Sequence, residues 1–312
     1  MARNEALEHR LAERPQDRGG YEVYADWLLG QGDPHGELIM AMLRAEDAPS
    51  RELAAQIAAL QAAQAGALPG VLTWKRGFID RISLDRIRVD DPVAPTLATV
   101  LDHPASVMAS AIEVRDFSPS EALDATIDVI ATRAPHTVRS LAFAVSNELS
   151  GFARIELPRL DSLAITSLES STSYVAIRGM SMGLGAQVLR DIAACRWPLT
   201  HLTLDFSQGD GTFEDLRPLF ERSDVALTHL ACALRVPTTP TLRALPTLLV
   251  RALVASPRAA QLEQLRLAMD LSRADYRVLI RNKDRFLRLR EVELPNERKA
   301  KRMVERSAGY DR

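Results

Sequence analysis

The chain has 312 residues, of which 46% are hydrophobic, 26% are charged and 5% are aromatic. This composition excludes a disordered chain, and the formal net charge of -2 gives no general reason to expect nucleic-acid binding. The first ten residues are charged where a secretory signal would be apolar, and no apolar run approaches the roughly 18 residues of a membrane helix. A cytoplasmic protein without a membrane segment is therefore expected.

Residues 1–72 predict a helical N-terminal cap without repeats. Apolar residues at helical spacing indicate helices over 6–12, 20–29, 37–46 and 50–65, the last of them capped by Ser50. Between the second and third helices, Gly30-Gln-Gly-Asp-Pro34 combines residues that end one helix and start the next, with Asp33 as a cap. A tight helical hairpin is expected here.

One segment of the cap resembles a known family. Tyr24-Ala-Asp-Trp-Leu28 is followed by Gly32-Asp-Pro-His-Gly-Glu37, and Trp74-Lys-Arg-Gly-Phe78 comes later. This combination is similar to the repeat-companion domain at the N-terminus of many bacterial leucine-rich-repeat proteins. The resemblance implies a cap that leads into repeats, and the family carries no established activity to transfer.

From Phe78 to Pro295 a short phrase recurs, apolar-x-x-apolar-x-apolar, and each copy follows a stretch with helical character. Its fourth residues are Ile82, Ile112, Leu141, Leu163, Leu202, Leu230, Leu265 and Val292, at intervals that average 30 residues. This period predicts an α/β leucine-rich-repeat-like solenoid, with a parallel sheet on its concave face and helices on its convex face. We expect the solenoid over residues 73–297 and a polar tail or helix over 298–312.

The phrase departs from regular leucine-rich repeats in the residues that follow it. Where a regular repeat has an Asn or Cys that bonds neighbouring turns, this chain has Arg88, Ser118, Glu148 or Gln208. Either each turn satisfies its backbone groups individually, or the predicted solenoid is irregular in its curvature.

Strand geometry assigns a direction to each position of the phrase. The first, fourth and sixth residues should point inward, and the third and fifth outward, so that stacked strands align the outward residues in two columns. These columns are small in the middle and charged at both ends. The predicted partner contacts are Arg81, Glu113, Arg115, His201, Thr203, Asp205, His229, Gln264, Arg266, Glu291 and Glu293. The alternative is that these positions are merely solvated.

Two further features bear on binding. The insertion at residues 167–183 predicts a loop on the binding face, and the glycine-rich stretch 179–185 lacks the Lys-Ser/Thr ending of a phosphate-binding loop. His201 and His229 occupy equivalent positions in adjacent phrases. Together with Asp205 they could hold a metal ion, although repeat similarity is the simpler interpretation of the pair.

The C-terminal part and the cysteines complete the pattern. From Arg273 to Arg312 the chain has 13 Lys or Arg against 7 Asp or Glu. A solvated face of the last repeat explains this excess, and an acidic partner or a nucleic-acid backbone is the alternative.

Cys195 and Cys232 are expected to be buried and reduced.

Neither the spacing of a catalytic triad nor a glycine-rich cofactor fingerprint is recognisable in the sequence. We therefore expect a non-enzymatic protein-protein interaction module, such as an adaptor, inhibitor or regulatory subunit, that binds a protein partner on its concave sheet. No cofactor, metal or small-molecule substrate is expected. A nucleic-acid-associated factor that uses the basic C-terminal face is the alternative. A metal-binding enzyme around His201 and His229 is a weaker one.

Overall fold

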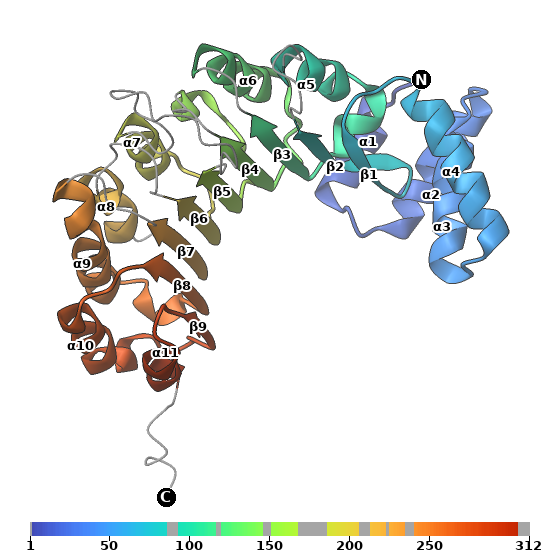
Figure 1. Cartoon of the computed structure of the whole chain (residues 1–312). Coiled ribbons are helices and arrows are strands. Elements are labelled where there is room, and N and C mark those ends of the chain that lie inside the picture. The colour runs from blue at the N-terminus through green and yellow to red at the C-terminus, as the bar shows by residue number, and fades with distance from the viewer. Residues whose placement is uncertain are drawn as a thin grey trace, which may run out of the picture.

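The computed structural model describes residues 2–85, 93–116, 120–145, 151–167, 186–205, 213–222, 225–234 and 240–304. The molecule is an elongated arch in which helices form one end and a nine-stranded sheet follows the inner, concave side (Figure 1). The strands lie in chain order from β1 to β9, so each one pairs with its neighbours in sequence. This arrangement confirms the predicted α/β class and the stacking of successive units.

The cap consists of α1 (Glu5–Glu13), α2 (Arg18–Gly30), α3 (His35–Asp47) and α4 (Arg51–Ala65). The strands are β1 (Val71–Lys75), β2 (Phe78–Asp85), β3 (Ala111–Asp116), β4 (Ser140–Val145), β5 (Ser162–Ser167), β6 (His201–Asp205), β7 (His229–Leu234), β8 (Gln264–Met269) and β9 (Glu291–Glu293). The helices of the arch are α5 (Val93–Leu101), α6 (Ser120–Arg133), α7 (Ala186–Ala194), α8 (Phe213–Glu221), α9 (Pro240–Ala255), α10 (Arg273–Arg281) and α11 (Glu297–Val304). Short 3-10 turns are η1 (Pro104–Met108), η2 (Phe152–Arg154), η3 (Ala259–Gln261) and η4 (Lys283–Arg285). Most of the helices of the arch lie on its outer, convex side (Figure 1).

The register of the sheet aligns the repeated phrases residue for residue. Strands β2 to β9 are parallel, and β1 pairs with β2 in the antiparallel sense. The third-position column is Arg81, Ala111, Ser140, Ser162, His201, His229, Gln264 and Glu291. The inward positions of all eight phrases are buried except Val292, which is partly exposed in the last strand. Both predicted columns are confirmed, and so is the predicted alternation of faces except at Ala111, an outward position that is buried.

Two hydrophobic clusters hold the molecule together. The larger one runs through the whole arch, from Ile79 in β2 to Met303 in α11. The smaller one lies in the cap and includes Phe78 of β2 and Met108 of η1. Because these two residues belong to the sheet region but pack in the cap cluster, they join the two parts of the fold.

The turn between β1 and β2 reaches into the cap. Lys75 pairs with Phe78, which leaves Arg76 and Gly77 as a two-residue turn with φ values of 48° and 89°. Positive φ at both positions is the backbone of a type I′ hairpin. A Cβ on Gly77 would lie 2.3 Å from Cγ1 of Ile39, so only glycine allows this approach to α3.

His35 and the ring of Phe78 complete this contact. The buried His35 side chain donates from Nε2 to the carbonyl oxygen of Gly77 over 2.7 Å. The Phe78 ring packs against the rings of His35 and Tyr24, with centroids 5.1 and 5.7 Å apart. Tyr24, Gly77 and Phe78 of the resembling segments, together with His35, therefore fix the cap to the sheet.

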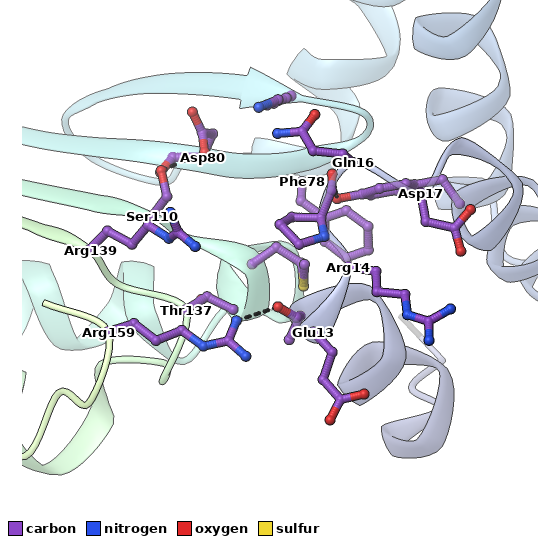
Figure 2. Close-up of a pocket in the computed structure, with 15 residues that line it drawn as sticks. Glu13, Arg14, Gln16, Asp17, Phe78, Asp80, Ser110, Thr137, Arg139 and Arg159 are labelled. Atoms are coloured by element: carbon purple, nitrogen blue, oxygen red, sulfur yellow. Dashed lines mark hydrogen bonds between the residues drawn. The ribbon is translucent and has the colours of Figure 1, made fainter. Parts of the chain in front are cut away.

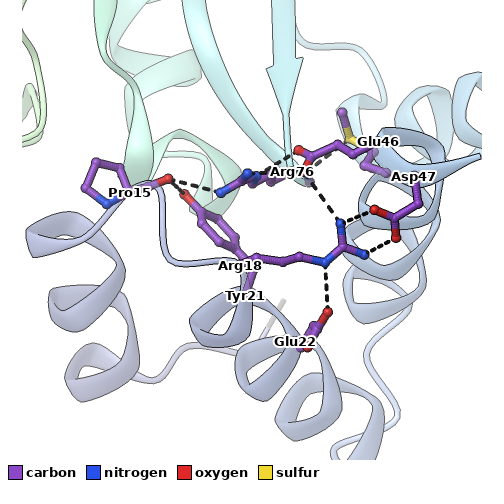
Figure 3. A network of polar contacts seen from close by, with 9 residues as sticks. Pro15, Arg18, Tyr21, Glu22, Glu46, Asp47 and Arg76 are labelled. Atoms are coloured by element: carbon purple, nitrogen blue, oxygen red, sulfur yellow. Dashed lines mark hydrogen bonds and ion pairs between the residues drawn. The ribbon is translucent and has the colours of Figure 1, made fainter.

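A charged network supports the same junction from the outside (Figure 3). Arg76 donates two hydrogen bonds to the carboxylate of Glu46, at 2.8 and 3.1 Å. Arg18 of α2 binds both carboxylate oxygens of Asp47, at 2.9 and 2.6 Å. The Arg76 guanidinium holds the pKa of Glu46 below its usual value. Helices α2 and α3 and the β1–β2 turn are thus tied together by paired charges.

The cap helices agree with the sequence prediction. Ser50 accepts a hydrogen bond from the amide of Leu53 at 3.1 Å, so it caps α4 as predicted. Asp33 accepts one from the amide of His35 at 3.0 Å, but the N-cap residue of α3 is Pro34 and not the predicted Asp33. The helix bounds differ from the predicted ranges by at most two residues at either end.

Some predictions concern residues outside the described part of the chain. These are the insertion from residue 168 onward, the glycine-rich stretch 179–185, and the turn residues Arg88, Ser118, Glu148 and Gln208. The segment after Val304 is outside it as well. Of the helices that the structure describes, none has both the length and the apolar character to span a bilayer.

Candidate functional site

The concave sheet is hollowed over its last four strands. A pocket of about 280 Å³ there is lined by seven of the eleven predicted contact residues: His201, Thr203, His229, Gln264, Arg266, Glu291 and Glu293. These residues occupy the third and fifth positions of β6 to β9, which the parallel register places side by side. We call this feature the concave hollow.

The other four predicted residues lie elsewhere. Arg81, Glu113 and Arg115 stand on β2 and β3, toward the cap, where Arg115 approaches Asp85 to 3.7 Å. Asp205 is buried, with 7% of its surface exposed, which contradicts its prediction as an open contact residue. It is the last residue of β6, where the strand ends and the alternation of faces no longer decides exposure.

His201 and His229 form a stacked pair at one side of the concave hollow. Their ring centroids are 3.9 Å apart and their planes differ by 14°. In each case Nδ1 lies 2.8 Å from the hydroxyl of the preceding threonine, Thr200 or Thr228. Because the same local contact orients both rings, their Nε2 atoms remain the nitrogens that a partner can reach.

This geometry limits the chemistry of the pair. Burial lowers the pKa of His229 below its usual value, and the neighbouring His201 lowers it further. Stacked rings direct their Nε2 lone pairs side by side, whereas a shared metal ion needs them to converge. Throughout the described ranges, no three His, Cys, Asp or Glu side chains are grouped for metal binding. The pair is therefore best suited to hydrogen bonds with a partner.

The remaining concave residues vary in size and charge along the arch. Ser140, Ala142, Ser162 and Ala164 of β4 and β5 are small and partly exposed, so they leave the sheet open to close approach. At the far end, Arg266 and Glu293 form an ion pair at 3.1 Å with more than 60% of each side chain exposed. Such exposed pairs contribute little stability and can exchange their partner for another charge.

The basic C-terminal residues lie outside the concave hollow. Arg277, Arg281, Arg285, Arg288 and Arg290 are all exposed, and none of them lines the concave hollow. The first two belong to α10, which lies on the outer side of the arch (Figure 1). A partner that binds Arg277 and Arg281 would thus contact the molecule outside the concave hollow.

The two cysteines offer no reactive thiol. Cys232 is buried as predicted, and burial raises the pKa of its thiol to about 12. Cys195 is partly exposed, which differs from the prediction, but burial still raises the pKa of its thiol to about 11. Both thiols are protonated at neutral pH and are poor nucleophiles.

A second pocket, which the sequence did not indicate, lies between the cap and the sheet (Figure 2). Its volume is about 570 Å³. It is lined by the connection from α1 to α2, by Tyr21, Lys75 and Phe78, and by side chains near the N-terminal ends of β2 to β5. These residues come from segments as far apart as Ala12 and Arg159, so no local pattern could have revealed it. We call it the junction pocket.

Comparison with known proteins adds no family assignment. No protein-family model matches the chain, and no curated protein matches it. The contacts, exposure and charges of the chain's own residues are therefore the basis for a function.

Proposed function

We propose that this chain is a non-enzymatic binding module that recognises a protein partner with the concave hollow over β6 to β9. An adaptor, an inhibitor and a regulatory subunit all fit this role. The observation that carries the proposal is the convergence of seven outward side chains from four neighbouring strands in one hollow. Repeat folds commonly use such extended concave sheets for binding.

The residues of the hollow suggest how the partner is recognised. Two imidazole Nε2 atoms and the amide of Gln264 offer hydrogen bonds, while Glu291 and Glu293 outnumber Arg266. A partner with a basic group above β9 would complement this surface, and charge complementarity sets orientation and partner choice. The small side chains of β4 and β5 would let the partner continue along the arch.

We further propose that the chain is a leucine-rich-repeat protein with a repeat-companion cap, in the cytoplasm of a bacterium. The recurring phrase, its 30-residue period and the resemblance of the cap support this assignment. The packing of the cap also supports it, because Tyr24 and Leu28 of the resembling segment are buried in the cap core.

The test uses the ion pair in the hollow. We would compare Arg266→Glu, Glu293→Arg and the double variant that carries both, as baits in native cell extract. Quantitative mass spectrometry would measure the partner, and binding of the purified partner would follow. We expect each single variant to recover at least about tenfold less partner, because a charge-assisted contact is typically worth 1.5–3 kcal/mol.

Two controls make the outcome decisive. Arg251→Glu, exposed on the convex helix α9, should leave recovery unchanged. The double variant keeps an internal ion pair but exchanges its charges, so it should bind as poorly as the single variants if the partner contacts these positions. Equal recovery with all baits would contradict the proposal. Binding that falls steeply with salt and survives the hollow variants would instead favour nucleic acid at the basic face.

A further inference from the structure

The junction pocket is held open from both sides of the α1–α2 connection. Arg159 donates to the carbonyl oxygen of Ala12 at the end of α1 (Figure 2). The carbonyl oxygen of Pro15 accepts hydrogen bonds from Arg76 at 3.3 Å and from the hydroxyl of Tyr21 at 3.4 Å. These contacts fix the connection across the strand ends, so the pocket is formed before any ligand binds.

Arg139, on the strand side of this pocket, has only a distant carboxylate as its charge partner. Its side chain is 56% exposed, and its nearest carboxylate, that of Asp161, is 4.0 Å away. No hydrogen bond from its guanidinium is found among the residues that the structure describes. By contrast, the carboxylate of Asp80 accepts a hydrogen bond from the hydroxyl of Ser110 at 2.6 Å.

The orientation of the other charges leaves the interior positive. Figure 2 shows Arg139 and Arg159 extending toward the α1–α2 connection, whereas the carboxylates of Glu13 and Asp17 point away from the strand ends. Four basic side chains line the pocket (Arg14, Lys75, Arg139 and Arg159), against three acidic ones (Glu13, Asp17 and Asp80). Arg14 also extends away from the strand ends in Figure 2, so Arg139 and Arg159 are the labelled basic groups on the strand side, which suits an anion.

The opposite wall is apolar. Pro15, Tyr21, Phe78 and Met108 form it, next to the cap cluster to which the last three belong. Ligand sites commonly combine such an apolar wall with a few polar groups that fix orientation. Both parts of the pocket must therefore be matched by one ligand.

We propose that the junction pocket binds a carboxylate carried on an apolar group, with Arg139 as its main charge partner. The guanidinium fork matches the two oxygens of a carboxylate, and Arg159 stands on the same wall. The apolar group would lie against Pro15 and Met108. Such a ligand could be a small organic acid or the C-terminal residue of a peptide.

The experiment follows the methyl resonance of Met108, assigned with Met108→Leu, in the full-length protein. The probes are 4-phenylbutyrate, its amine counterpart 4-phenylbutylamine, the tripeptide Gly-Gly-Phe and the C-terminal amide of that tripeptide. We expect at least one carboxylate to shift the resonance with a Kd on the order of 1 mM, as is usual for fragments of this size. The amine and the amide should not bind. Preference for phenylbutyrate would identify a small acid, and preference for the tripeptide a chain terminus.

Substitutions of Arg139 make the test specific. Arg139→Glu should weaken binding of the carboxylate ligand at least about tenfold. Arg139→Lys should weaken it less, because lysine keeps the positive charge but cannot make the bidentate contact of a guanidinium group. Arg277→Glu, exposed on α10, changes the net charge equally and should have no effect. Thermal melting would verify that each variant is folded. The proposal is overturned if neither carboxylate shifts Met108 at about 20 mM, well above the expected Kd, if the amine binds equally, or if Arg139→Glu leaves affinity unchanged.

Discussion

At the scale of single residues, His35 shows how one side chain serves the junction. A carbonyl oxygen can only accept, so the Nε2 atom that contacts Gly77 must carry a proton. A second proton would place a charge in the core, and burial accordingly lowers the pKa of His35 below its usual value. The neutral ring is therefore the form that the folded cap requires.

This predicts a pH dependence of stability. Between the lowered folded pKa and the unfolded value of about 6.5, the unfolded state binds more protons, so the free energy of unfolding falls as the pH decreases. The slope from one histidine is at most about 1.4 kcal/mol per pH unit. We expect His35→Gln, measured by urea denaturation from pH 7.5 to pH 5, to reduce the slope. His9→Gln, exposed on α1, is the matched control. An unchanged slope in His35→Gln would mean that the histidine is not neutral in the folded protein.

The direction of most side chains could be predicted from the sequence, because alternation along a strand decides it. His201 and His229 were correctly expected to be neighbours on the concave face. The burial of Asp205 was not predicted, since this residue lies at a strand end, where alternation no longer decides which side chains are exposed. The threonine contacts that orient the two imidazoles depend on rotamers, which a strand pattern does not specify.

At the scale of elements, α2 and α3 are packed unusually closely. A Cβ on Gly36 would lie 2.7 Å from the carbonyl oxygen of Ala25 and 2.8 Å from Cγ of Leu29. Backbone cannot move aside as a flexible side chain can. The glycine in the family-like segment is therefore explained by the contact between these two helices.

We predict that Gly36→Ala destabilises the protein by about 2 kcal/mol, because the helices must separate to admit the methyl group. Gly30→Ala is the control, since a Cβ at Gly30, the last residue of α2, meets nothing within 4 Å. The second change should cost nothing or stabilise slightly, by restricting the unfolded chain. Urea denaturation measures both. Equal destabilisation by both substitutions would show that the close approach of α2 and α3 does not exclude a methyl group at Gly36.

The elements themselves were largely predictable, because helical spacing, caps and the repeated phrase are local signals. The β1–β2 turn shows where that information ends. Its segment, Trp74 to Phe78, was recognised by resemblance, but its insertion against Ile39 depends on the distant helix α3. A sequence pattern names such a residue without showing what it contacts.

At the scale of the whole molecule, each unit of the arch touches mainly its neighbours in sequence. Such stacks unfold according to local stability and nearest-neighbour contacts. Two tryptophans report on different places. Trp27 lies in the cap, and Trp197, close before β6, donates from its indole nitrogen to the carbonyl of Ile155 at 3.2 Å.

We predict that Leu202→Ala, which empties a fully packed position of β6, lowers the urea midpoint reported by Trp197 more than the midpoint reported by Trp27. The local cost should be about 3 kcal/mol. Fluorescence of variants that retain one tryptophan measures each midpoint. Leu28→Ala, equally buried in α2, should show the reverse order. Identical shifts at both probes would indicate that the arch and the cap unfold as one cooperative unit.

The curved stack was predictable because it follows from a local phrase repeated in order. The junction pocket was not, because it exists only where the α1–α2 connection crosses strands that are far away in sequence. The concave hollow was predictable only in part. The sequence columns identified the residues that line it, but they could not show that these side chains leave an open space above the sheet.

The last strand has a consequence for how copies of the chain behave toward one another. A parallel sheet with an open edge can recruit a further strand from another molecule and so grow into a fibre. Here β9 is three residues long, carries Glu291 and Glu293, and is followed by α11, which packs beside it. The two carboxylates on this short edge strand repel the same carboxylates on a second copy of the chain, so this end of the sheet should resist polymerisation even in a crowded cell.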